Sequence, residues 1–97
     1  MITKDDKIVF GMNSKKTKKL VKLLSIDKSY AIIRLLLKEP LNMTIISKKL
    51  SIKLPVLVHY LKILDEIGLL TITIKKHPTK KRKTKYYKVK PFILSIP

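Results

Sequence analysis

The chain has 97 residues, and 23 lysines and arginines against 6 acidic residues give it a formal net charge of +17. This length is enough for one domain with one core, which leaves little room for a deep catalytic cleft. A strongly basic domain attracts polyanions. We therefore expect a small binding module with a polyanionic partner.

Several residue types are scarce or missing, and this excludes whole classes of chemistry. The sequence has no cysteine, so it has no disulfide, no thiolate metal site and no cysteine nucleophile. With only two glycines it has no glycine-rich phosphate loop. His59 and His77 alone do not make a metal site, and no nucleophile has a base nearby. We expect no enzymatic activity, no metal and no cofactor, and we see no sign of a small-molecule ligand.

Nothing in the sequence indicates a membrane segment. No apolar stretch approaches the roughly 20 residues that span a bilayer, and the opening segment MITKDDKIVF lacks the apolar region of a secretory signal. A hydrophobic fraction of 45% is that of a folded domain. We expect a cytoplasmic protein that is associated with the nucleoid.

The first half of the chain has mainly helical periodicity. Residues 1–13 are interpreted as an N-terminal arm, with a short apolar run near its end that suits a strand. Leucines at helical spacing predict a first helix over 14–24, with Ser14 as its cap. A second helix over 28–38 is apolar almost all round, so we expect it at the centre of the fold, with Asp27 as its cap.

Two further helices and a hairpin follow. A short helix is expected over 44–50, capped by Asn42 or Thr44, and after a tight turn a longer helix runs from about 54 to 67 and ends at Gly68. The buried stripe of the longer helix consists of Leu57, Leu61 and Leu64.

Alternating segments on both sides of a basic turn predict a β-hairpin over about 69–89. Two helices joined by a short turn and followed by a hairpin describe a winged helix-turn-helix, with three to four helices and a two- or three-stranded wing. We assign it to residues 14–90 and class the fold as α+β, mainly α. Residues 91–97 form an apolar C-terminal tail, which either covers the core or packs on a second subunit.

The segment PLNMTIISKKLSIKLPVLVHYLKILDEIGLLTI resembles the winged-helix core of ArsR-type and related archaeal transcriptional regulators. The resemblance extends from about 27 to 89. The features that carry it are Pro40, Leu41, Ile46, Leu50, Leu57, His59, Leu61, Leu64, Gly68, Leu69, Tyr86 and Tyr87. It implies a DNA-binding transcriptional regulator with double-stranded DNA as its partner, and we expect a homodimer because one small module contacts few bases.

The longer helix offers the face opposite its buried leucines to the major groove, and such helices read bases with their N-terminal half. Its candidate DNA contacts are Lys53, Leu54, Pro55, Val58, His59 and Lys62. The candidates on the supporting helix, for flanking phosphates, are Lys48 and Lys49. The wing candidates, for the backbone or the minor groove, are Lys75, Lys76, Lys80, Lys81, Arg82, Lys83, Lys85 and Tyr86.

Two departures from the family leave other functions open. Leu54, Pro55 and Val58 offer only apolar contacts where such regulators commonly carry polar side chains, so direct base readout is limited. The cysteines that sense metals and a long C-terminal dimerisation helix are both missing. One alternative is a chromatin-like protein that coats duplex DNA with little sequence preference. Another is a winged-helix module that binds protein or RNA through an apolar patch of Leu54, Val56, Val58 and Ile63.

Overall fold

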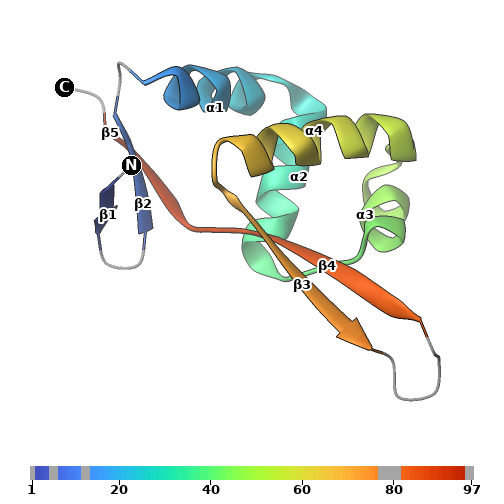
Figure 1. Ribbon diagram of the computed structural model, residues 1–97. Helices are drawn as coiled ribbons and strands as arrows, with labels where there is room; N and C mark the ends of the chain where they lie inside the picture. The colour runs from blue at the N-terminus through green and yellow to red at the C-terminus, as the bar shows by residue number, and fades with distance from the viewer. Residues whose placement is uncertain (1, 5–6, 12–13, 77–81, 96–97) are drawn as a thin grey trace.

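The computed structural model describes residues 2–4, 7–11, 14–76 and 82–95. Within them, four helices form the body, and two small sheets lie at opposite ends of it (Figure 1). The helices are α1 (Lys15–Ser25), α2 (Asp27–Lys38), α3 (Met43–Leu50) and α4 (Leu54–Glu66). The strands are β1 (Ile2–Lys4), β2 (Lys7–Gly11), β3 (Leu70–Lys76), β4 (Lys83–Val89) and β5 (Phe92–Ser95).

The first two helices follow each other with one residue between them. Ser14 caps α1 as predicted, since its hydroxyl accepts a hydrogen bond from the Thr17 amide at 3.0 Å. The predicted cap of α2 is wrong: Asp27 is the first helical residue, and Ile26 is the N-cap without a side-chain bond. The helix entry is instead held by the buried hydroxyl of Ser29, which donates to the carbonyls of Leu23 and Ile26.

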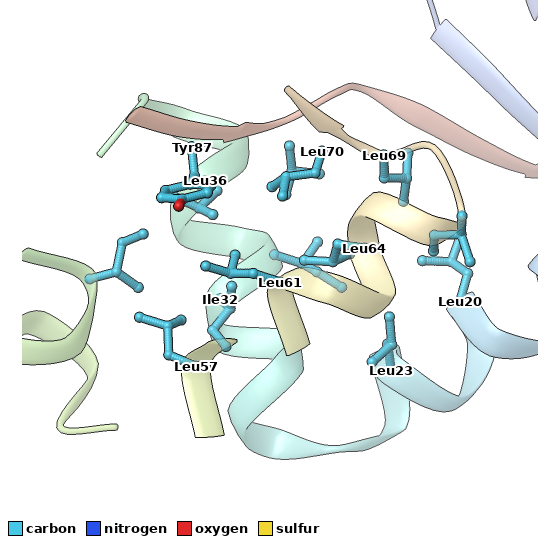
Figure 2. Packing of buried hydrophobic residues seen from close by; sticks show 14 of the residues in the cluster. Leu20, Leu23, Ile32, Leu36, Leu57, Leu61, Leu64, Leu69, Leu70 and Tyr87 are labelled. Atoms are coloured by element: carbon cyan, nitrogen blue, oxygen red, sulfur yellow. The ribbon is translucent and has the colours of Figure 1, made fainter. Parts of the chain in front are cut away.

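The core surrounds α2, as expected from its apolar sequence (Figure 2). Ile32 and Leu36 of this helix are fully buried, and the leucine stripe of α4 is buried with them. Figure 2 shows side chains from α1, α2, α4 and β3 converging on this cluster. Removing these side chains from water supplies most of the free energy that holds α4 in place.

The turn between α3 and α4 is tied together by one serine. Asn42 caps α3 by accepting from the Ile45 amide at 2.9 Å. Ser51 adopts the left-handed conformation, with φ of 52°, and ends the helix. The Ser47 hydroxyl donates to the Ile52 carbonyl at 2.6 Å, and the Ile52 amide donates to the Ser47 carbonyl at 3.1 Å. These bonds fix the direction in which α4 begins.

The end of α4 has the hydrogen bonds of a Schellman motif. The Gly68 amide donates to the Asp65 carbonyl at 3.0 Å, and the Leu69 amide donates to the Leu64 carbonyl at 2.9 Å. Gly68 has φ of 81°, a conformation that glycine adopts without a steric penalty. The motif turns the chain directly into β3 and thereby fixes the hairpin relative to α4.

Strands β3 and β4 pair antiparallel from Leu70↔Val89 to Lys76↔Lys83. The hairpin is joined to the body by a bridge between Leu41 and Tyr87, with backbone bonds of 2.8 and 3.1 Å. Its outer part extends past α3, away from the helices (Figure 1). The two-stranded hairpin agrees with the alternation in the sequence.

The second sheet joins the two ends of the described chain. Strand β2 lies between β1 and β5 and pairs parallel with β5, from Ile8↔Phe92 to Gly11↔Ser95. Phe10 is buried, and its ring meets that of Phe92 edge-on at 6.2 Å. The segments that we interpreted as an arm and a tail are therefore neighbours, a pairing that we did not predict.

Candidate nucleic-acid interface

The outward face of α4 is accessible from the start of the helix to Lys62. Pro55, His59 and Lys62 are exposed, as is Lys53 just before the helix, and Leu54 keeps 47% of its surface in solvent. No acidic residue interrupts the sequence between Glu39 and Asp65. This half of the helix is therefore neutral to basic, with an apolar tip.

Val58 is the half-buried member of the α4 candidates. It lines a shallow, mainly apolar hollow between α4 and the hairpin, together with Lys62, Asp65, Ile72 and Tyr87. The sequence predicted Val58 among the DNA contacts of the helix, and its partial burial follows from its place in this hollow. Helix α4 and the hairpin thus lie side by side, and apolar side chains line the hollow between them.

The candidates on α3 lie in its last turn. Lys48 and Lys49 are both exposed there, and α3 packs against α4 through buried Ile46. The two lysines are adjacent in the sequence, so they point about 100° apart around the helix. They lie beside the turn that leads into α4.

The hairpin has two different faces because side chains alternate along each strand. The face directed at the helices carries Leu70, Ile72, Ile74, Lys76, Lys83, Lys85, Tyr87 and Val89. The opposite face carries Thr71, Thr73, Lys75, Thr84, Tyr86 and Lys88. The candidates of the hairpin are therefore divided between its two sides.

The helix-directed face brings two lysines close to the start of α3. Lys83 and Lys85 line a second open hollow with Asn42 and Thr44. No acidic side chain lines this hollow, and the N-terminus of α3 adds its positive helix dipole. Arg82 borders the same hollow.

On the opposite face, the ammonium group of Lys75 lies 5.5 Å from the centre of the Tyr86 ring. Tyr86 is half-buried beneath it. The Lys88 ammonium donates to the Leu37 carbonyl at the end of α2, at 3.3 Å. Lys80 and Lys81 lie outside the described residues.

The acids of α4 are confined to its C-terminal end. Glu66 forms an ion pair with Lys19 of α1, at 3.4 Å between Nζ and Oε2. Both side chains are more than half exposed, so the pair contributes little stability. Asp65 lies next to it in sequence, beyond the half of the helix that we assign to base contact.

The four residues of the proposed apolar patch do not share one surface. Val58 faces the hairpin, whereas Ile63 lines a groove on the other side of α4, against α1. Val56 packs against the core cluster. Leu54 is thus left as the exposed apolar residue of the set.

Two residues of this region were missed from the sequence. Ile72 and Ile74 are exposed although they belong to the helix-directed face of the hairpin. The alternation in LTITIKK was a sufficient signal for a common face, but it did not indicate that this face extends beyond the core. In the described part of the chain, no cluster of histidine and acidic side chains is arranged to hold a metal ion.

Comparison with known proteins identifies the fold. No protein-family model matches the sequence, and no curated protein matches it significantly. Among solved structures, the chain is similar to HlyU from Vibrio cholerae, a winged helix-turn-helix regulator of the ArsR/SmtB family. The TM-score is 0.60 at 24% identity, over 80% of this chain and 78% of that one. The chain has the winged helix-turn-helix fold.

This result confirms the fold predicted from the sequence. In the terms of the winged helix, α3 is the supporting helix, α4 the recognition helix and the β3–β4 hairpin the wing. At 24% identity, the match shows the fold alone. No helix among the residues that the structure describes is long and apolar enough to cross a bilayer.

Proposed function

We propose that the protein is a DNA-binding transcriptional regulator that inserts α4 into the major groove and grips the adjacent backbone or minor groove with its wing. The observation that carries the proposal is the placement of the charges. The recognition helix is free of acids in its N-terminal half, and basic wing residues lie beside the start of α3. A duplex meets positive charge at each of these elements.

We expect the major-groove contacts of α4 between its start and Lys62. A helix of 13 residues spans roughly 20 Å at about 1.5 Å per residue, which fits the length of groove that such helices occupy. His59 and Lys62 offer hydrogen-bond donors to base edges, and Leu54 and Pro55 offer apolar contact to thymine methyl groups. Lys48 and Lys49 contact the flanking phosphates.

The wing provides the electrostatic part of the affinity. Nine lysines and arginines lie between Lys75 and Lys90, without an acid. If about six basic residues of the protein neutralise phosphates, the logarithm of the affinity falls with the logarithm of salt concentration at a slope near −5. Binding is therefore strong at low salt and decreases steeply as salt is added.

The apolar tip of the recognition helix favours a second candidate function. Leu54 and Pro55 discriminate base pairs only by the thymine methyl, so selectivity from direct contacts is limited. This limited selectivity is sufficient for a chromatin-like protein that coats duplex DNA. A homodimer compensates for the limited readout of one module, and we expect two half-sites separated by about 34 Å along the duplex.

Selection from a randomised duplex library at near-physiological salt tests the proposal. A narrow enriched motif supports a sequence-specific regulator, and two-fold symmetry in that motif supports the dimer. Retention of duplexes without a motif supports the chromatin-like coat. Failure to retain any duplex contradicts both functions and leaves a protein or RNA partner.

A further inference from the structure

The wing exposes two isoleucines on its basic face. Ile74 keeps 57% of its surface in solvent, the largest fraction among the exposed large hydrophobic residues of the described chain, and Ile72 keeps 44%. Both belong to the face that carries Lys83 and Lys85. This is an unusual place for large apolar side chains, because they are not needed there to close the core.

The two faces of β3 carry different residues at exposed positions. On the opposite face, the corresponding positions are Thr71 and Thr73, which are also exposed. Threonine has the same β-branched shape and the same preference for strands as isoleucine. Strand formation alone therefore does not require isoleucine at these positions, and on β3 the large apolar residues occur only on the face directed at the helices.

The charges around the isoleucines indicate what covers them. Their cross-strand partners are Tyr87 and Lys85, and the next rung outward pairs Lys76 with Lys83. Asp65 of α4 lines the hollow that Ile72 also lines, whereas the hairpin itself carries no acid, because no acidic residue occurs after Glu66 in the sequence. A face that is both apolar and cationic is complementary to the DNA minor groove, whose walls are deoxyribose and whose rims are phosphates.

We propose that Ile74 enters the minor groove and wedges into a base step, so that the protein bends the DNA it binds. Ile72, about 6.7 Å nearer to the body along the strand, packs on the sugars at the groove entrance. The lysines around Ile74 contact phosphates of both DNA strands. The inference rests on the proposed function, because α4 in the major groove brings the wing to the adjacent minor groove.

A wedge of this kind has measurable consequences for the DNA. Apolar side chains that unstack a step bend duplexes by roughly 20 to 90° toward the major groove. Pyrimidine–purine steps such as TA unstack most easily. The protein should therefore bind a duplex with a central TA step several-fold more tightly than the same duplex with AA in its place.

The test is energy transfer between dyes at the two ends of a short duplex of mixed sequence with a central TA step. We expect transfer to rise when the protein binds, and the Ile74→Thr variant to lose at least half of this rise. Its salt dependence should stay unchanged, because no charge is removed. The matched control is Thr73→Ile, which adds an isoleucine on the opposite face and should leave the rise unchanged.

The outcomes separate the inference from the proposed function. If the protein binds the duplex and leaves it straight, or if Ile74→Thr bends it as the original chain does, the wedge is wrong and DNA binding stands. If no duplex is bound at low salt, the proposed function is wrong and the wedge is wrong with it. Circular dichroism of both variants verifies that the fold is intact.

Discussion

Removal of two wing lysines tests how this surface contacts DNA. The variant Lys83→Gln/Lys85→Gln deletes the two lysines that line the hollow beside the start of α3. Both side chains are exposed, so the change leaves the core intact. Glutamine keeps the side chain polar and is one atom shorter than lysine, so the main change is the loss of charge.

The expected magnitude comes from counterion release. Each phosphate contact contributes about 0.9 to the slope of log affinity against log salt, so two lost contacts reduce a slope near −5 by about 1.8. If the variant and the original chain bind equally at about 1 M salt, the variant should bind about 30-fold more weakly at roughly 0.15 M salt. Fluorescence anisotropy of a labelled duplex over a salt series measures both quantities.

A second variant separates local contact from net charge. Lys15→Gln/Lys16→Gln removes the same charge from the exposed start of α1, at the other end of the helical body from the outer part of the wing (Figure 1). We expect its slope to change by less than about 0.5, since distant exposed charges are screened. Equal slope changes in the two variants would mean that the wing makes no specific phosphate contact, which would refute the reasoning.

Three further predictions concern the elements that position the interface. Leu61→Ala removes a side chain that is 3% exposed and should lower the free energy of unfolding by about 2 to 5 kcal/mol in urea titration; a loss below ~1 kcal/mol would contradict its place in the core. Ser51→Gly should stabilise the protein by roughly 0.5 to 1 kcal/mol, because it relieves the left-handed backbone after α3; a lower melting temperature would be the opposite result. Gly68→Ala forces an L-residue to φ of 81° and should cost about 1 to 2 kcal/mol, with weaker DNA binding because the wing shifts relative to α4; unchanged stability and affinity would speak against this role.

The helices and the wing were predictable because each has a local signature. Periodic leucines and a following glycine define α4, and strict alternation defines β3. The Asp27 cap was predicted wrongly for a physical reason: Ile26 serves both as the C-cap of α1 and as the N-cap of α2, so no linker residue remains to act as a cap.

The pairing of strands that are distant in the sequence could not be predicted. The parallel contact between β2 and β5 joins short segments separated by more than 80 residues, and neither has a pattern that specifies the other. The composition of the candidate site could not be fully predicted for the same reason. Alternation placed Ile72 and Ile74 on one face, but only the register with β4 shows that Lys83 and Lys85 share it.

The central claim is that α4 contacts the DNA, and the introduction of negative charge on this helix is the most direct test. Leu54→Glu/His59→Glu places two carboxylates at exposed positions of α4, and Val21→Glu/Tyr30→Glu adds the same number of carboxylates at exposed positions of α1 and α2. Thermal unfolding verifies that both variants are folded. With α4 in the major groove, the first variant should bind duplex DNA at least about tenfold more weakly than the second, a difference of about 1.4 kcal/mol. Equal affinities for the two variants would show that α4 does not face the DNA.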